Sequence, residues 1–311
     1  MKRTPQVLMF LPLATSILVA APSSSIAGTT NLIAVADTGL FENNPNNNLG
    51  GMNFMPVGTT GPAASGSRSR GLLKFDVANH VPAGATISSA TLSLTVVGFN
   101  GFGRDFKLHR VFRPWTEGSG TGIAPGVGLG SAANPGDSTW NSRSHSDSTW
   151  SVPGGQDGTD YASTVSATAT MGFEPMVFTS ETLASDVQMW LDDSGTNSGW
   201  LIMIGDESPF STASMIATRE SSGSEPVLTI EFTFAAAPNP PEFFDIALVE
   251  NAIRFSFNAQ SSHSYAVEFT DSFNPTNWTV LTNIAASPED TTISVTNVVD
   301  SGERYFRASA Q

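Results

Sequence analysis

The sequence contains no cysteine in its 311 residues. Disulfide-linked scaffolds, thiol chemistry and cysteine-bound zinc are therefore excluded. Charged residues are also scarce, at 14%, whereas hydrophobic residues reach 40% and there are 28 glycines and 19 prolines. Such a chain is too apolar to be disordered and too rich in turn-forming residues for a helical bundle. The composition favours many short strands joined by turns.

Positive charge is scarcer than negative charge. Lysine and arginine total 14 against 28 aspartates and glutamates, which gives a formal net charge of −14 and a pI near 4.5. Nucleic-acid-binding proteins carry a basic surface, and an acidic membrane surface repels a chain of this charge. We therefore expect neither nucleic acid nor an acidic membrane surface as a partner.

The first residues have the three parts of a secretory signal peptide. Lys2 and Arg3 are positive, residues 7–21 are mostly apolar, and Ser25, Ile26 and Ala27 form a small-residue cleavage site. The apolar run is shorter than the roughly 20 residues that a membrane-spanning helix needs. We predict a signal peptide over residues 1–27, with a retained anchor as the alternative. The mature chain is then expected to be secreted, extracellular or at the cell surface, with no membrane span.

A proline-rich stretch divides the rest of the chain. Residues 235–242 read AAAPNPPE, and proline is excluded from the interior of a sheet and stiffens a linker. We predict one domain over residues 28–234, the linker over 235–242, and a second domain over 243–311.

Alternating hydrophobicity predicts strands on both sides of the linker. In the larger piece, apolar residues at every second position of 90–96 and of 228–234 alternate with polar ones, which is typical of strands with one buried face. In the smaller piece, residues 253–257 and 265–269 show the same pattern. Residues 118–136 are almost all Gly, Ala, Ser and Pro and predict a long flexible surface loop.

One segment has helical periodicity instead. Leu183, Val187, Trp190 and Leu191 recur at the spacing of one helix face, and Ser180 is a suitable N-cap. The predicted fold is therefore all-β: a jelly-roll β-sandwich with one short helix, followed by a small immunoglobulin- or fibronectin-like β-sandwich.

Eight motifs give the larger piece a family likeness. In chain order they are ADTGL, NPNNNLG, RGLLKFDV, VPAGATISSATLSL, PWTEG, STWNS, SDVQMWL and TRESSGSEPVLTI. Over about residues 31–233 this order resembles a DNRLRE domain, a family also classed as carbohydrate-binding module family 96. The resemblance implies a secreted jelly-roll module that accompanies polysaccharide-degrading or surface domains, with acidic polysaccharides such as alginate as the ligand class. A long Gly/Ala insert between PWTEG and STWNS departs from the family pattern.

The end of the chain has a likeness of its own. The stretch from FSFNAQSSHSYAVEFTDSFNPTNWTVLTNI to GERYFRAS resembles the small fibronectin-like module that ends many secreted proteins of polysaccharide-degrading bacteria. This resemblance implies architecture and location more than a function.

The sequence offers little for catalysis. Its four histidines lie in separate segments, and no HExxH, GxSxG or phosphate-binding glycine motif is present. Carboxylates are mostly in turn-like contexts, where turn formation is their ordinary role. We expect no catalytic residues; a lyase site built on His109 and Tyr161, or a hydrolase, is the alternative.

Cationic side chains are expected on one face of two strands. Period two places them opposite apolar residues that point into the sandwich. Such a face could pair with the carboxylates of uronic acids, and an aromatic ring could stack on a sugar. The alternative is a solvated face whose charges are neutralised by nearby acids. The predicted ligand-binding residues are Arg68, Arg70, Lys74, Lys107, His109 and Arg113, together with Trp150 in a loop.

A structural Ca²⁺ is the predicted cofactor. Exported sandwiches without disulfides can use a hard cation to tie strand ends, and carboxylate oxygens are the ligands that Ca²⁺ prefers. Asp37 and Glu220 would meet if the strands they flank are neighbours, and Asp157 with Asp160 is a second candidate pair.

These patterns lead to one functional expectation and two alternatives. We predict a secreted, non-catalytic carbohydrate-binding protein that recognises an acidic, alginate-like polysaccharide through the cationic face. The first alternative is a structural or adhesive protein of the cell surface or matrix that binds no glycan. The second is a polysaccharide lyase or hydrolase.

Overall fold

The computed structural model describes residues 25–124, 128–173, 175–235, 238–272, 277–298 and 303–310. Up to residue 24 the predicted signal peptide lies outside the described residues, as do residues 236 and 237 of the predicted linker. One compact unit spans Ile26–Phe234, and the chain from Ala235 onward belongs to a second unit. None of the helices in the described part of the chain has the length and apolar character needed to span a membrane.

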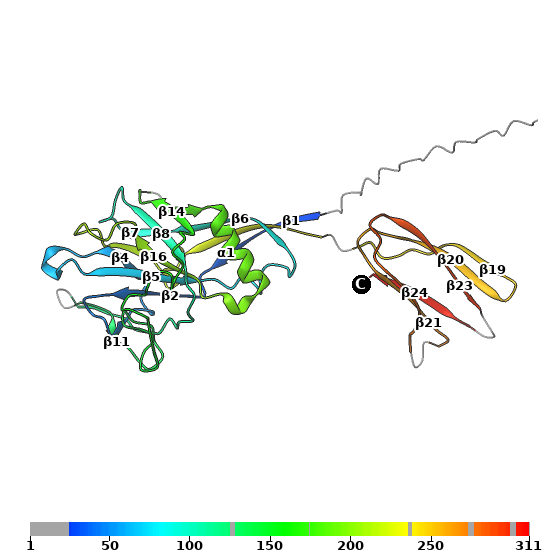
Figure 1. Ribbon diagram of the computed structural model, residues 1–311, viewed down its shortest axis with the longest axis horizontal. Helices are drawn as coiled ribbons and strands as arrows, with labels where there is room; N and C mark the ends of the chain where they lie inside the picture. Colours follow the sequence, from blue (N-terminus) through cyan, green and yellow to red (C-terminus); the bar gives the residue numbers. More distant parts are fainter. Residues whose placement is uncertain are drawn as a thin grey trace, which may run out of the picture. The chain divides into compact units, whose positions relative to one another are not determined.

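The larger unit is built on two β-sheets (Figure 1). The four-stranded sheet has the order β1 (Ser25–Ile33), β18 (Val227–Ala235), β6 (Thr86–Leu94) and β15 (Met176–Thr179). The eight-stranded sheet has the order β14 (Ala167–Thr170), β8 (Asp105–Arg110), β16 (Trp200–Ile204), β5 (Arg68–Lys74), β4 (Phe54–Thr59), β17 (Ser214–Ala217) and β7 (Val96–Gly98), and β2 (Ala36–Phe41) also pairs with β5. The pairings of β6 with β18 and β15, and those of β5 with β2, β4 and β16, are antiparallel.

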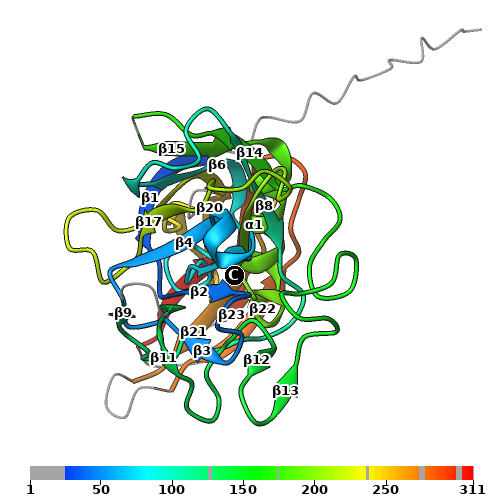
Figure 2. The same cartoon turned by 90° about the vertical axis from the view of Figure 1, so that its left-hand side faces the viewer.

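Short elements complete this unit. Three short two-stranded pairs are β3 (Asn47–Asn48) with β11 (Ser131–Ala132), β9 (Ile123–Ala124) with β10 (Gly128–Leu129), and β12 (Ser142–Ser144) with β13 (Ser148–Thr149). Figure 2 shows β3, β11, β12 and β13 on the side of the eight-stranded sheet away from β6 and β15. The unit also contains one α-helix, α1 (Glu181–Asp192), and two short 3₁₀ turns, η1 (Pro62–Ala64) and η2 (Ser194–Thr196).

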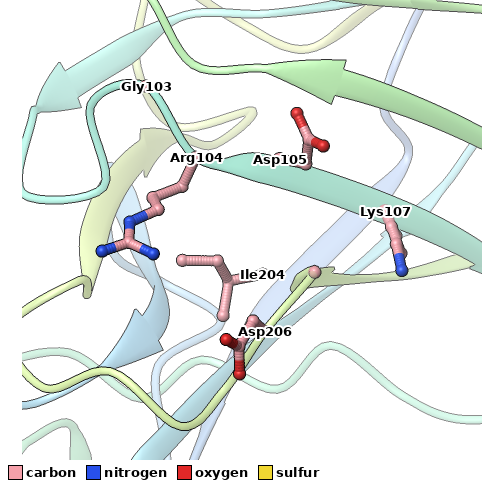
Figure 3. A pocket seen from close by; sticks show the side chains of 7 residues that line it. Gly103, Arg104, Asp105, Lys107, Ile204 and Asp206 are labelled. Atoms are coloured by element: carbon pink, nitrogen blue, oxygen red, sulfur yellow. The ribbon is translucent and has the colours of Figure 1, made fainter.

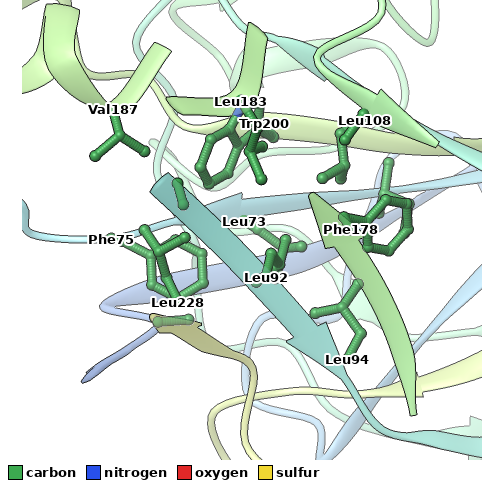
Figure 4. Packing of buried hydrophobic residues seen from close by; sticks show 14 of the residues in the cluster. Leu73, Phe75, Leu92, Leu94, Leu108, Phe178, Leu183, Val187, Trp200 and Leu228 are labelled. Atoms are coloured by element: carbon green, nitrogen blue, oxygen red, sulfur yellow. The ribbon is translucent and has the colours of Figure 1, made fainter. Parts of the chain in front are cut away.

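The main core lies between the two sheets and under α1 (Figure 4). Leu92 and Leu94 from β6 face the same interior as Leu73 from β5, as the alternating pattern predicts. α1 begins after Ser180, whose hydroxyl accepts the backbone N–H of Leu183 at 2.9 Å. The predicted all-β fold with one short helix is confirmed.

A second apolar cluster covers the outer face of β5 and β16. It consists of Leu40, Leu72, Val111, Trp140, Trp150, Tyr161 and Leu201. Four of these residues come from the segments 111–161 that follow β8, so the outer face of the eight-stranded sheet is roofed by loops and hairpins. This roof of loops and hairpins covers several of the predicted ligand-binding residues.

Residues 118–136 are held more closely than the predicted flexible loop. The Gly120 N–H donates to Asn48 Oδ1 at 2.7 Å. At Gly118, where φ is +81°, a Cβ would lie 2.5 Å from the Asn48 side chain. Glycine is therefore needed for close approach to a buried asparagine, and residues 125–127 of this stretch lie outside the described residues.

The smaller unit has two three-stranded sheets. Their orders are β19 (Phe244–Val249), β20 (Ala252–Ala259) and β23 (Thr291–Val298), and β22 (Thr279–Ile284), β21 (Tyr265–Thr270) and β24 (Tyr305–Ala310). Phe255 and Phe257 of the first sheet share a core with Tyr265 and Val267 of the second.

Candidate functional site

The predicted cationic face is mostly closed. Arg70 is 6% exposed, and its Nε and Nη2 donate to the two carboxylate oxygens of Glu207 at 2.9 and 2.8 Å. Arg68 makes the same two-pronged contact with Glu42, at 3.1 and 2.8 Å. These hydrogen bonds hold the pKa of Glu42 below its ordinary value. The expectation that Arg70 is open to a ligand is wrong, because its guanidinium is buried against Glu207. Arg68 stays partly exposed but is paired with Glu42.

The other predicted cationic residues are not gathered on one open face. Lys107 and His109 both project from β8 on the side opposite its core residues, but His109 is buried, with its Nδ1 2.8 Å from the Ala162 carbonyl oxygen. Burial lowers the pKa of His109. Arg113 is exposed beyond the end of β8. Lys74 is half-buried beside a separate cavity.

The predicted stacking residue Trp150 is also interior. It is 5% exposed and donates its indole N–H to the Thr139 carbonyl oxygen at 3.0 Å. The glycines that follow it in sequence suggest an open loop, but here they fold over the apolar cluster: a Cβ at Gly154 would lie 2.5 Å from the Trp140 ring. Trp150 is therefore a packing residue.

The two predicted metal pairs have different outcomes. Asp160 is buried, and its oxygens accept from the backbone N–H groups of Ser151 and Gln156 and from the Ser151 hydroxyl. It organises a loop, and exposed Asp157 does not join it in an acidic cluster among the described residues. Both oxygens of Asp160 thus already accept hydrogen bonds from its own loop.

Asp37 and Glu220 do meet, together with Glu117, which the sequence analysis missed. One oxygen from each lies within 4.8 Å of the others. Glu117 is held in place by its carbonyl oxygen, which accepts from Asn48 Nδ2 at 2.7 Å. The signal that could have found it is the PWTEG motif, whose glutamate stands directly before the closely packed Gly118.

An open cavity lies at the other end of β8, where Lys107 projects. Its volume is about 340 Å³, and it is lined by Gly103, Arg104, Asp105, Lys107, Ile204, Gly205 and Asp206 (Figure 3). Among the described residues, neither Arg104 nor Lys107 forms an ion pair with a carboxylate. Asp206 accepts from the Ser208 backbone N–H at 2.9 Å, which lowers its pKa. The cavity therefore offers a ligand two cations outside any ion pair, Arg104 and Lys107, beside the carboxylates of Asp105 and Asp206.

Three exposed phenylalanines adjoin this cavity, and we call them the phenylalanine platform: Phe99, Phe102 and Phe173. They are 42%, 50% and 81% exposed. The ring centroid of Phe173 lies 4.6 Å from that of Phe102 and 6.1 Å from that of Phe99. Large aromatic rings that touch one another in solvent are unusual on a soluble protein and indicate a contact surface.

Backbone pairing explains why the platform and the cavity are contiguous. The ladder between β8 and β14 continues beyond both strands, since the Gly103 N–H donates to the Met171 carbonyl and the Met171 N–H to the Arg104 carbonyl, each at 2.9 Å. Phe102 and Phe173 are therefore brought together next to Arg104. The sequence signal was Phe102 between Gly101 and Gly103, an aromatic ring in a turn.

We compared the chain with protein-family models and with curated proteins. No family model matches the chain. No curated protein matches it either. The likeness to DNRLRE domains and to a fibronectin-like module therefore stays a prediction from motifs.

Proposed function

We propose that the larger unit binds a polysaccharide containing uronic acids, at the surface formed by the phenylalanine platform and the neighbouring Arg104 and Lys107. The observation that carries the proposal is the contact of three exposed phenylalanine rings beside Arg104 and Lys107, which form no ion pair among the described residues. Binding without catalysis is part of the proposal.

The chemistry of the surface suits such a ligand. Aromatic faces pack against the C–H faces of pyranose rings, and a guanidinium forks onto a carboxylate. A uronate polymer presents both groups along its length. On a chain with a net charge of −14, Arg104 and Lys107 would favour binding here over the more acidic parts of the surface.

The surface differs from the one expected from sequence. Only Lys107 belongs to both sets of residues. The proposal agrees with export by the signal peptide predicted over residues 1–27. It also agrees with the ligand class that the DNRLRE resemblance implies. Both of these are themselves still proposals.

Binding to alginate, polygalacturonate and a neutral glucan tests the proposal by calorimetry and affinity electrophoresis. We expect Phe173→Ala and Arg104→Ala each to weaken uronate binding about tenfold, which corresponds to about 1.4 kcal/mol. Phe112→Ala and Arg113→Ala are the matched controls, because both residues are exposed beyond the opposite end of β8.

The outcomes separate the alternatives. If Arg113→Ala weakened uronate binding and Arg104→Ala did not, the binding site would lie on the strand face predicted from sequence, not at the phenylalanine platform. Binding to no glycan would favour a structural or adhesive role. Release of unsaturated or reducing products from alginate would show an enzyme and overturn the proposal.

A further inference from the structure

Three carboxylates from distant parts of the chain converge at the start of β2. Asp37 is the second residue of that strand, Glu117 follows β8, and Glu220 lies between β17 and β18. Backbone groups fix two of them, since the Asp37 N–H donates to Glu117 Oε1 and the Arg219 N–H donates to Asp37 Oδ2, each at 2.8 Å. The cluster is therefore part of the folded framework.

Asp37 is the member that points to a ligand. The residue is 0% exposed, and its Oδ1 has no hydrogen-bond donor among the described residues. Oε2 of Glu220 is buried and equally without a donor. A buried carboxylate oxygen left without a donor or a cation destabilises the folded state.

The neighbouring arginine does not satisfy these two oxygens. The guanidinium of Arg219 donates to both oxygens of Glu117, at 2.6 and 2.7 Å, and lies 3.1 Å from Glu220 Oε1. Its contact with Asp37 is through the backbone N–H alone. One positive charge thus faces three carboxylates, and burial raises the pKa of Asp37 to about 8.

We propose that Asp37, Glu117 and Glu220 bind one Ca²⁺, with Asp37 Oδ1 and Glu220 Oε2 as the anchoring ligands. Two oxygens that bind the same Ca²⁺ at roughly 2.3–2.6 Å lie at most about 5 Å apart. One oxygen of each carboxylate lies within 4.8 Å of the other two, a spacing that suits ligands of one common ion. The ion would tie β2 to the segments before β9 and β18. This proposal is independent of the glycan site.

The test uses the purified full chain, freed of metal with a chelator, and CaCl₂ alone as the probe. Calorimetric titration at neutral pH is expected to give one bound Ca²⁺, and thermal unfolding is expected to shift upward when CaCl₂ replaces the chelator. Glu220→Gln should weaken Ca²⁺ binding at least tenfold and abolish the upward shift. Asp147→Asn, an exposed carboxylate elsewhere in the unit, is the matched control and should behave as the unmodified chain.

Asp37→Asn separates a Ca²⁺ ligand from a carboxyl that is simply protonated. Without metal this variant should be at least as stable as the unmodified chain, because a neutral amide replaces a buried carboxyl whose Oδ1 has no donor among the described residues. With CaCl₂ it should gain no stability. No heat of binding at millimolar CaCl₂ in the unmodified chain would overturn the proposal. Glu220→Gln binding Ca²⁺ as tightly as the unmodified chain would overturn it as well.

Discussion

At the scale of single residues, Arg70 links the eight-stranded sheet both to Glu207, in the segment after β16, and to the roof. Arg70 also donates from Nη1 to the Gly154 carbonyl oxygen at 2.7 Å and lies 5.5 Å from the centroid of the Trp140 ring. We expect Arg70→Ala to lower the free energy of unfolding by about 3–5 kcal/mol, because it leaves Glu207 largely buried without its partner. Denaturant unfolding measures this loss.

A double variant controls for the charge. Arg70→Met combined with Glu207→Gln removes both charges at similar volume and should recover much of the loss. Arg68→Ala is the exposed comparison, since that side chain is 40% exposed, and it should cost about 1 kcal/mol or less. Equal losses for Arg68→Ala and Arg70→Ala would contradict the assignment of Arg70 to the interior.

Residue periodicity predicted which way Arg70 points but not what covers it. The alternation in β5 correctly sends Leu73 into the main core. Whether the opposite face is open depends on residues 111–161, whose path is not encoded in the local pattern of β5. The same limit applies to Trp150, which local glycines suggest is open and tertiary packing buries.

At the scale of elements, α1 is the segment that sequence predicted best. Its apolar face, its N-cap and the burial of Trp190 against Trp200, with ring centroids 4.4 Å apart, follow from helical spacing. Ser180→Ala should lower the free energy of unfolding by about 1 kcal/mol, because the Leu183 N–H loses its acceptor. Denaturant unfolding checks this loss, and Ser185→Ala, on the exposed face of α1, should change it by less.

Pairings between elements were harder to predict. Strand-forming segments with strict alternation, such as β6 and β18, were identified, whereas the two-residue strands β9 and β11 lie in a stretch too rich in glycine to show a period. The meeting of Asp37 with Glu220 was anticipated from their positions beside strands. Glu117 joins them through the packing of the PWTEG segment on Asn48; the motif draws attention to Glu117, but it does not show which carboxylates Glu117 meets.

At the scale of the whole molecule, each unit has a hydrophobic core of its own. The main core of the larger unit contains Leu92, and the core of the smaller unit contains Phe257, both 0% exposed. Units that bury separate cores are expected to unfold in separate cooperative steps. Differential scanning calorimetry of the full chain should therefore resolve two transitions.

Core truncations assign these two transitions. Leu92→Ala should destabilise only the larger unit and Phe257→Ala only the smaller unit, each by about 2–5 kcal/mol of unfolding free energy. Each substitution removes packing contacts and leaves a cavity in one core alone. CaCl₂ should raise only the transition that Leu92→Ala lowers, since Asp37, Glu117 and Glu220 all belong to the larger unit. A single transition that both variants and CaCl₂ move together would instead mean that the two cores are energetically coupled, and the stability of the phenylalanine platform would then depend on the smaller unit as well.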